Sequence, residues 1–236
     1  MKVGTDGVLL GAWASVPSPG SRVLDIGTGT GLVALMIAQR AKDAIIDALE
    51  IDPSSARQAR ENFQKSPWKD SLSCIRASFQ EYSAQNKDLY DLIICNPPYF
   101  SASTPAPSHE KNLARHDDSL SLEDLFTGSM KLMKKTGLLS LILPVQKDGT
   151  AMELVREHQL HCKRRTHVRP APGKALHRVL LEFSRAAGQC RENELTIETG
   201  KRHHYTDAYQ KLTKDFYLEP GNGSNPTDLD HRLQAG

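Results

Sequence analysis

The sequence lacks the features that mark a membrane protein, a secreted protein or a zinc-binding protein. No apolar stretch approaches the roughly 20 residues of a membrane-spanning helix. The N-terminus shows no basic region followed by a long apolar core, so we expect no signal peptide. The cysteines at positions 74, 95, 162 and 190 contain no CxxC pair, which argues against a zinc site and against a disulfide framework. We therefore expect a cytoplasmic protein in a reducing environment, with no bound metal.

What is present fits a globular protein of ordinary size. The 236 residues suit one α/β domain, and an apolar content of 39% is enough for a core. A net charge of only +2 excludes a chain that binds polyanions along its whole length. The charge is uneven, however, and its distribution matters below.

Short apolar runs alternate with segments of helical periodicity. Strands are predicted at residues 21–27, 44–52, 71–77, 89–96, 137–144, 162–168 and 178–184. Helices are predicted at residues 8–14, 32–40, 54–64, 120–133 and 149–158. This rhythm indicates right-handed βαβ units and a mainly parallel sheet, with the last two strands antiparallel at an edge. Residues 195–218 are expected to form a short strand and a helix, and residues 219–236 a flexible tail.

The most informative segment is DLIICNPPYF at residues 91–100, a buried strand that ends in Asn-Pro-Pro-Tyr. Asn96 carries both a carbonyl oxygen and an NH2 group, and the prolines fix the backbone so that the carbonyls of Asn96 and Pro97 can point outward together. Two acceptors suit an NH2 group on a planar ring or amide, and Tyr99 can stack on that plane. The alternative is a Pro-Pro turn that only ends the strand.

A glycine-rich turn, DIGTGTG, joins the first predicted strand to a helix. Gly27, Gly29 and Gly31 allow a ligand close to the backbone and leave N–H groups free at the helix start. The spacing D-x-G-x-G-x-G places Asp25 before the glycines. An acid there suits an amino acid's ammonium group and disfavours a pyrophosphate, so the predicted ligand is S-adenosylmethionine.

Further residues are candidates for the same ligand. Glu50 closes the second strand about 20 residues after the loop and is preferred over Asp52 for the ribose hydroxyls. Ser78 and Phe79 would lie beside the adenine, although a core role for Phe79 is an open alternative.

The polar pair Thr5 and Asp6 precedes the first predicted strand. These side chains would close over the methionyl carboxylate and amine of the ligand. The alternative is that they cap the apolar helix that follows.

Basic residues gather between positions 163 and 178. The members singled out are Lys163, Arg164, Arg165, Lys174 and Arg178. On adjoining edge strands they would form a positive surface for a phosphate backbone, and the alternative is a solvated face. The segment 100–118 has no period and is expected to be a functional lid or disordered. In that segment, Arg115 could add substrate contacts.

Together these motifs resemble a class I amino-methyltransferase, and the finer pattern resembles the tRNA1(Val) (adenine(37)-N6)-methyltransferase family. The matching segments are KVGTDGVLLGAWA at 2–14, VLDIGTGTGLVALMIAQR at 23–40, ALEIDPSSARQARENFQKSPW at 48–68, DLIICNPPYF at 91–100, HRVLLEFSRAAGQC at 177–190 and YTDAYQKLTKDFYL at 205–218. They cover nearly all of residues 2–218. Ser78 stands where relatives often have Asp, and members usually carry an extra stretch before the lysine of KVGTDG.

The resemblance implies a Rossmann-like α/β fold of seven mainly parallel strands with helices on both faces, as one domain over residues 1–218. It also implies methyl transfer from S-adenosylmethionine to N6 of an adenine in tRNA, at position 37 of tRNA1(Val). In that reaction Asn96 and the Pro97 carbonyl would hold the amine, Tyr99 would stack on the base, and Pro98 and Phe100 would contact RNA. A monomer is favoured.

Three alternatives remain open. A protein glutamine N5-methyltransferase also uses Asn-Pro-Pro-Tyr, but it would have no use for the basic residues. A ribosomal-RNA base methyltransferase is a near rival. An RNA-binding module on an inactive methyltransferase fold is disfavoured by the intact motifs, and a nicotinamide oxidoreductase is disfavoured by the glycine spacing.

Overall fold

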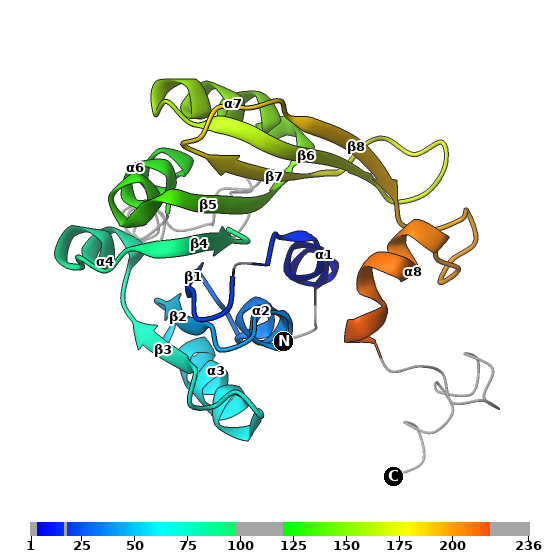
Figure 1. Ribbon diagram of the computed structural model, residues 1–236. Coiled ribbons are helices and arrows are strands. Elements are labelled where there is room, and N and C mark those ends of the chain that lie inside the picture. The colour runs from blue at the N-terminus through cyan, green and yellow to red at the C-terminus, as the bar shows by residue number, and fades with distance from the viewer. Residues whose placement is uncertain (1–3, 17, 98–119, 218–236) are drawn as a thin grey trace, which may run out of the picture.

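The computed structural model describes residues 4–16, 18–97 and 120–217, and strands and helices alternate through most of them (Figure 1). The strands are β1 (Arg22–Ile26), β2 (Ile45–Glu50), β3 (Leu72–Arg76), β4 (Tyr90–Cys95), β5 (Met133–Pro144), β6 (His161–Arg169), β7 (Arg178–Ser184) and β8 (Arg191–Thr196). The α-helices are α1 (Thr5–Trp13), α2 (Leu32–Arg40), α3 (Pro53–Lys65), α4 (Phe79–Gln85), α6 (Leu122–Leu132), α7 (Asp148–Glu157) and α8 (Asp207–Thr213). Among these helices, none is long and apolar enough to span a bilayer.

All eight strands join one sheet in the order β3-β2-β1-β4-β5-β7-β6-β8. The five strands from β3 to β5 are parallel to one another. β7 runs antiparallel to both β5 and β6, as expected for the last two predicted strands. β8 then adds to β6 in parallel, so all strands except β7 point the same way. Their carboxyl ends therefore meet at one edge of the sheet.

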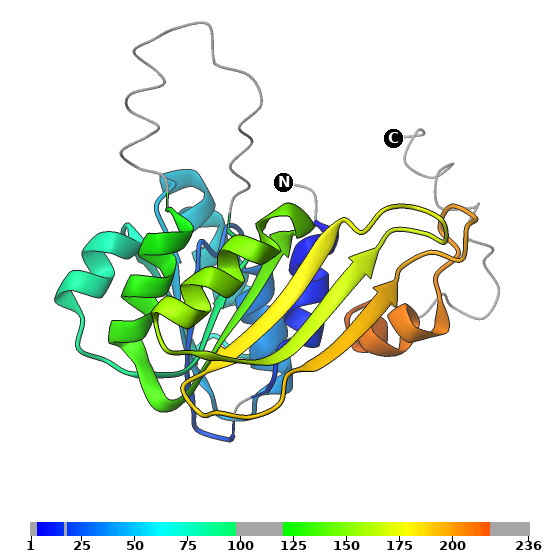
Figure 2. The ribbon, with the colours of Figure 1, turned by 90° about the horizontal axis from the view of Figure 1, so that it is seen from above.

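The sheet has eight strands rather than the expected seven, because the short strand expected within residues 195–218 begins at Arg191 as β8 and also joins the sheet. Its sequence, RENELT, contains a single apolar residue, Leu195, and its other residues are exposed or half-buried. An outer strand with so little apolar surface lacks the pattern by which strands are recognised. Because β8 covers β6, the antiparallel pair of β6 and β7 is internal rather than at the edge. Figure 2 shows β6, β7 and β8 side by side.

Two apolar layers enclose the sheet. Because successive side chains of a strand point to opposite faces, Val23 of β1 packs in one layer and Leu24 in the other. The first layer contains buried residues of α1, α2, α3 and α8, and the second those of α4, α6 and α7. This is the arrangement expected for βαβ units with helices on both faces of a parallel sheet.

A buried carboxylate joins α1 to the antiparallel half of the sheet. Glu182 of β7 is 2% exposed. Its carboxylate accepts hydrogen bonds from the Ser15 backbone N–H and hydroxyl, at 3.0 and 2.8 Å, and from the Ser140 hydroxyl of β5, at 2.9 Å. Arg164 of β6 forms the ion pair, with 2.9 Å between Nε and Oε1. One side chain thus connects α1, β5, β6 and β7.

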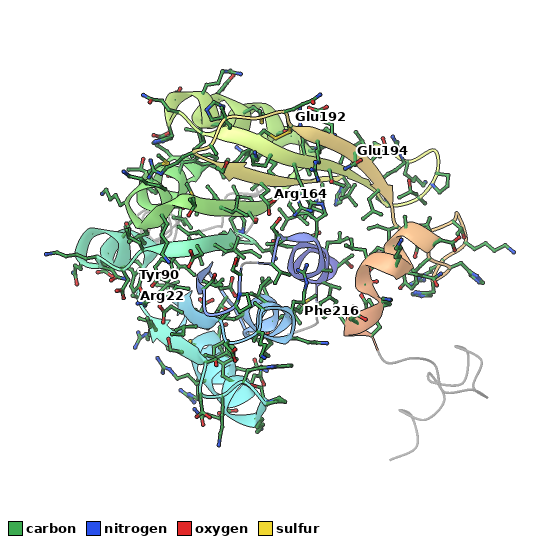
Figure 3. All side chains as sticks on the ribbon, viewed as in Figure 1. Arg22, Tyr90, Arg164, Glu192, Glu194 and Phe216 are labelled. Atoms are coloured by element: carbon green, nitrogen blue, oxygen red, sulfur yellow. A yellow bond between two sulfur atoms is a disulfide. The ribbon has the colours of Figure 1, made fainter. Side chains whose placement is uncertain are left out.

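The same arginine also holds the end of α1. The Arg164 guanidinium lies over the Trp13 ring, 4.0 Å from its centroid, and donates to the Trp13 carbonyl. The indole N–H of Trp13 donates to the Thr166 hydroxyl of β6. Figure 3 shows Arg164 between α1 and the sheet. The cation–π contact and the hydrogen bonds explain why Arg164 points inward.

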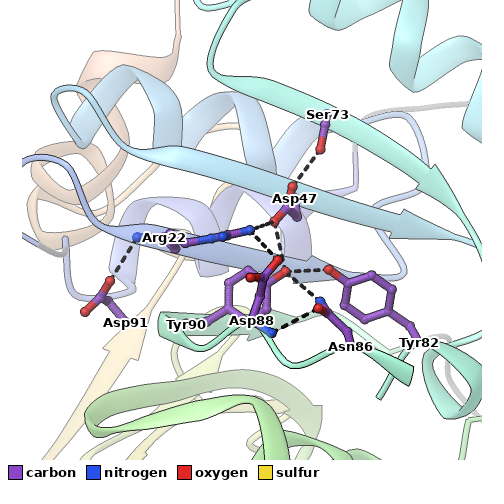
Figure 4. A network of polar contacts seen from close by, with 8 residues as sticks. All are labelled: Arg22, Asp47, Ser73, Tyr82, Asn86, Asp88, Tyr90 and Asp91. Atoms are coloured by element: carbon purple, nitrogen blue, oxygen red, sulfur yellow. Dashed lines mark hydrogen bonds and ion pairs between the residues drawn. The ribbon is translucent and has the colours of Figure 1, made fainter. Parts of the chain in front are cut away.

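A second polar network lies at the amino end of the parallel strands (Figure 4). Asp47 of β2 accepts hydrogen bonds from Arg22 of β1 at 2.9 Å, Ser73 of β3 at 2.7 Å and Tyr90 of β4 at 2.9 Å. Burial, the hydrogen bond with Tyr82 and the charge of Asp47 raise the pKa of Tyr90, so its hydroxyl stays protonated and donates. The network ties four strands together at the edge opposite to the strand carboxyl ends.

The structure corrects the expectation that the cysteines form no disulfide. A disulfide joins Cys162 of β6 to Cys190, just before β8, with the two Cα atoms 5.2 Å apart. The partners are 28 residues apart in sequence and become neighbours only because β8 follows β6 in the sheet. Among the described residues, Cys74 and Cys95 are free.

We expect Tyr90→Phe to lower the free energy of unfolding by about 1–3 kcal/mol, because the buried Asp47 and the half-buried Tyr82 lose a hydrogen-bonding partner while the ring volume is kept. Tyr205→Phe is the matched control, since its hydroxyl has no hydrogen bond to any described residue and its side chain is partly exposed. Urea unfolding of both variants measures the difference. Equal stability of the two variants would contradict a stabilising role for the network.

Candidate active site

The candidate site lies at the carboxyl ends of β1, β2 and β4. In the parallel pairing Ile26 of β1 is opposite both Leu49 of β2 and Cys95 of β4. The next residue along each segment is Gly27 after β1, Glu50 at the end of β2 and Asn96 after β4. The fold therefore brings these three predicted residues together. In open α/β sheets this edge is where ligands bind.

The three glycines of the loop after β1 all adopt positive φ angles, of 68° at Gly27, 58° at Gly29 and 87° at Gly31. The surroundings that favour glycine differ between Gly31 and Gly27. A Cβ atom on Gly31 would collide with the Phe63 ring of α3, so this glycine permits close packing at the start of α2. A Cβ atom on Gly27 would meet nothing within 4 Å. Gly27 therefore faces open space beside the strand ends, as a ligand cradle requires.

Asp25 organises this loop from below. Its side chain is only 1% exposed, and its Oδ2 accepts hydrogen bonds from the Thr28 hydroxyl at 2.6 Å and from the Ala34 N–H at 3.2 Å. Burial, and to a lesser extent the charge of Glu50, raises the pKa of Asp25 to about 6. The sequence motif placed this acid at the mouth of the site, whereas the structure buries it beneath the loop, and the motif did not indicate a role for Thr28. The hydroxyl of Thr28 anchors the loop to the Asp25 carboxylate.

Glu50 fixes the opposite side of the loop. Its Oε2 accepts from the Gly29 N–H at 2.8 Å and its Oε1 from the Asp52 N–H at 2.9 Å. A carboxylate has about four acceptor sites, so capacity remains for two ligand hydroxyls. The rival Asp52 caps α3 through the Ser55 N–H. This division of roles favours Glu50, as predicted, as the acceptor for ribose hydroxyls.

Asn96 lies just beyond β4 with its side chain half-buried. Its Oδ1 atom is buried and makes no hydrogen bond to any described residue. A buried acceptor without a donor costs about 1–3 kcal/mol, so such atoms usually have a partner. Pro97, the next residue, is buried. The unsatisfied oxygen at this edge points to a ligand that donates a hydrogen bond.

Ser78 and Phe79 have structural roles, and their contact with adenine stays a prediction. Ser78 caps α4 in a capping box with Glu81, which explains a serine at this position. The Ser-x-x-Glu spacing was a signal for this helix, which was not predicted. Phe79 is 4% exposed and packs against Gly128 of α6. Its position favours the core alternative over contact with an adenine.

Thr5 and Asp6 lie in the first turn of α1, and the capping residue is Gly4, so neither caps the helix. Asp6 forms an ion pair with Arg178 of β7, with 3.0 Å between Nε and Oδ2. A cavity of about 430 Å³ opens between α1 and the strand ends. Its lining residues are Thr5, Asp6, Leu9, Val168, Pro170, His177, Arg178 and Ile197. No sequence motif indicates this cavity, because its walls come from four separate segments.

The predicted basic surface on β6 is largely neutralised. Arg164 points inward to Glu182, which corrects its placement on a phosphate-binding face. Arg165 pairs with Asp148 of α7 at 2.5 Å and with Glu192 of β8 at 3.3 Å. Lys163 is half-buried, and Lys174 is exposed in the loop between β6 and β7. The predicted residues therefore do not form one continuous positive surface.

Four predicted residues, Pro98, Tyr99, Phe100 and Arg115, lie outside the described residues. Within the described ranges, no group of three or more His, Cys, Asp or Glu residues is placed to hold a metal ion. The groups that the structure does place fit S-adenosylmethionine. They are the open cradle at Gly27, the Glu50 carboxylate and the unsatisfied Oδ1 of Asn96.

Comparisons with known proteins show which sequences this chain resembles. The family model of the methyltransferase small domain matches residues 8–152. A tRNA1(Val) (adenine(37)-N6)-methyltransferase of Flavobacterium psychrophilum is 44% identical over 219 residues, which are 93% of this chain and 93% of the relative. A protein of the same name from Bacteroides thetaiotaomicron is 45% identical over 219 residues, covering 92% and 91% of the two chains.

Solved structures support the fold. A predicted O-methyltransferase from Agrobacterium tumefaciens matches with a TM-score of 0.67 and 20% identity, covering 89% of this chain and 96% of that one. A ribosomal protein L11 methylase from Lactobacillus delbrueckii matches with a TM-score of 0.53 and 17% identity, covering 77% of each chain. At these identities the likeness concerns the fold alone, and it confirms the expected Rossmann-like methyltransferase architecture.

We expect Gly27→Ala to weaken the binding of S-adenosylhomocysteine by at least about tenfold, because the added Cβ enters the open cradle and shifts the loop. Gly20→Ala is the matched control. Gly20 also has a positive φ, of 76°, and an open Cβ position, but it lies in a turn before β1. Both variants should lose about 1–2 kcal/mol of stability from backbone strain. Calorimetry that finds equal ligand affinities for both variants would contradict the cradle.

We also expect the affinity for S-adenosylhomocysteine to fall as the pH drops below about 6. Asp25 becomes protonated in that range, so the negative charge that attracts the ligand's ammonium group is lost. The affinity should then fall by up to about tenfold for each pH unit. Asp25→Asn should bind weakly at every pH between about 5 and about 8, whereas Asp52→Asn should keep the wild-type profile. A wild-type affinity that does not change over this range would refute the role of Asp25.

Proposed function

The chain belongs to the methyltransferase small domain family and, within it, to the family of tRNA1(Val) (adenine(37)-N6)-methyltransferases, and we propose on that basis that it methylates N6 of adenine 37 in tRNA1(Val). The observation that carries the proposal is the unsatisfied, buried Oδ1 of Asn96 at the carboxyl end of β4. An exocyclic amine is a planar hydrogen-bond donor that satisfies this atom. The tRNA substrate implies that the protein acts in the cytoplasm.

S-adenosylmethionine supplies an electrophilic methyl group on a positively charged sulfur. The loop from Gly27 to Gly31 would hold the amino-acid end of this cofactor at the start of α2, and the Asp25 carboxylate lies beneath the loop, where it accepts from the Ala34 N–H. Glu50 accepts the ribose hydroxyls on the other side of the loop. Because Glu50 also binds the Gly29 N–H, cofactor binding and loop geometry depend on the same carboxylate.

Asn96 orients the nucleophile. When the amine donates one N–H to Oδ1 of Asn96 and the other to the Pro97 carbonyl, its lone pair is turned toward the methyl group. The new N–C bond would form as the S–C bond of the cofactor breaks, which would leave S-adenosylhomocysteine. The amine would gain positive charge, so both hydrogen bonds would strengthen in the transition state, and the methylated nitrogen would then lose one proton to solvent. No residue needs to act as a nucleophile, and orientation supplies most of the rate.

The target adenine must leave its stack to reach this edge, because the amine is otherwise shielded by neighbouring bases. Tyr99, which follows Asn96 by three residues, is proposed to stack on the extruded base, and Pro98, Phe100 and Arg115 to contact the RNA around it.

A glutamine side chain of a protein would satisfy the same two acceptors. We disfavour this alternative, and methylation of ribosomal RNA, because the relatives at 44–45% identity carry the tRNA name over more than nine tenths of the chain. Transfer of labelled methyl groups to unmodified tRNA, to ribosomal RNA and to a release-factor protein separates the three. The proposal requires that tRNA is the preferred acceptor.

We expect Asn96→Ala to reduce methyl transfer to tRNA by about 10²-fold or more, since one orienting hydrogen bond in a closed site is worth about 3 kcal/mol. The affinity for S-adenosylhomocysteine should change little. Asn193→Ala, on the exposed part of β8, is the control and should retain full turnover. Single-turnover rates at saturating cofactor measure the effect, and near-normal rates in Asn96→Ala would mean that the amine is held elsewhere.

A further inference from the structure

The arginines of β6 leave little positive charge on that strand for RNA. Besides the pairs of Arg164 and Arg165, Arg169 forms an ion pair with Glu194 of β8, with 2.7 Å between Nε and Oε1. Glu192 and Glu194 thus lie alongside the β6 arginines, as Figure 3 shows for the two glutamates on β8. A phosphate that approached this face would meet carboxylates as well as guanidinium groups.

Unneutralised basic residues gather instead in the turn after β8. Lys201, Arg202, His203 and His204 are all exposed, and none forms an ion pair with another described residue. Tyr205 follows them and is 39% exposed. Its ring packs at 5.0 Å from that of Tyr209, which holds it in place. Basic side chains beside a fixed, exposed aromatic ring are typical of surfaces that bind nucleic acids.

The turn has a defined backbone that presents these side chains. Glu198 and Tyr205 pair as an antiparallel bridge, and the Thr199 N–H donates to the His204 carbonyl at 2.8 Å. The His204 N–H donates to the Lys201 carbonyl, which closes the turn. The Glu198 carboxylate accepts from the His203 backbone N–H and not from a basic side chain. The positive charges of the turn therefore remain available.

The turn lies at the same edge of the sheet as the active site. β8 is parallel to β6, and its carboxyl end is at the edge that carries Asn96. The Glu198 N–H donates to the Pro170 carbonyl, which joins the turn to the loop that carries the exposed Lys174. β8 is four strands from β4, and at about 4.8 Å per strand the separation is about 20 Å. That distance equals roughly six nucleotide steps of about 3.4 Å.

We propose that the exposed residues Lys174, Lys201, Arg202, His203, His204 and Tyr205, here called the β8-turn surface, bind the phosphate backbone of the RNA substrate beside the reacting nucleotide. This inference rests on the proposed function. Lys174, Lys201 and Arg202 neutralise phosphates, and Tyr205 stacks on an unpaired base. The partner is an RNA segment with unstacked nucleotides, such as a loop, because exposed aromatic rings bind bases only where these are splayed out.

The cavity beside α1 adjoins this surface. Pro170 and Ile197 adjoin the turn, and Thr5 and Asp6 of α1 form the opposite wall. Its lining combines apolar residues (Leu9, Val168, Pro170 and Ile197) with polar ones (Thr5, Asp6, His177 and Arg178), a mixture that suits a nucleotide.

The test compares two double variants that each remove two positive charges. Lys201→Ala/Arg202→Ala changes the β8-turn surface, whereas Lys65→Ala/Lys69→Ala changes exposed lysines around the end of α3 at the opposite edge. Binding of an unmodified tRNA transcript is measured over a series of salt concentrations. The turn variant should bind about tenfold more weakly, and its slope of log K against log salt should flatten by roughly 0.7–0.9 for each phosphate that it no longer neutralises. The α3 variant should match the wild type.

Tyr205→Ala adds an independent readout. It should weaken tRNA binding but leave the salt slope unchanged, because stacking is not ionic. All variants should bind S-adenosylhomocysteine as the wild type does, which shows that they are folded. If the turn variant matches the α3 variant in affinity and slope while the wild type methylates tRNA, the surface proposal is overturned and the proposed function stands. If the wild type transfers no methyl group to tRNA, both are overturned.

Discussion

The ion pair between Glu182 and Arg164 is the contact on which the arrangement of this protein depends. Burial alone raises the pKa of Glu182, but the hydrogen bond and charge of Arg164, with the two donors of Ser15, outweigh it and leave the pKa below its ordinary value. The carboxylate is therefore ionised inside the sheet. Removing one partner of such a pair leaves an uncompensated buried charge, which costs about 3–5 kcal/mol.

The position of α1 follows from this contact. Arg164 and Ser15 hold the carboxyl end of the helix against β6 and β7, and the Asp6–Arg178 ion pair holds its beginning at the edge where the strands end. The helix thus lies with its first turn beside the active site. A segment from the start of the chain becomes one wall of the cavity because residues more than 150 positions later fix it there.

The amino ends and the carboxyl ends of the strands form two edges of the sheet with different properties. The amino edge holds the network around Asp47, in which charges and hydroxyls satisfy one another across four strands. The carboxyl edge holds an acceptor without a donor at Asn96, glycines with positive φ and, in the turn after β8, basic residues without acidic partners among the described residues. Stability and chemistry therefore depend on different residues, so loops at the reacting edge can change with little effect on the other.

Sequence reasoning succeeded where the information is local. The bounds of α2 and β7 agree with the predicted helix and strand, and the positions of Gly27, Glu50 and Asn96 at three strand ends followed from the alternation of strands and helices. It failed where distant segments decide. A run of basic residues on β6 indicated a positive surface, but Glu182, Asp148, Glu192 and Glu194 neutralise it, and no short window contains both partners. The disulfide was missed for the same reason, and the short strand expected within residues 195–218 begins earlier, at Arg191, as β8.

β8 also determines how this sheet ends. An outer strand presents unpaired backbone N–H and C=O groups to any other extended chain, and it is a common starting point for fibrous self-association. Here that strand carries Arg191, Glu192 and Glu194 as exposed side chains, and its one apolar residue, Leu195, is buried. A copy of the same strand added alongside would have to bring these charges together and out of water. The low apolar content of β8, which made the strand hard to recognise in the sequence, is thus also what lets the sheet end at this strand.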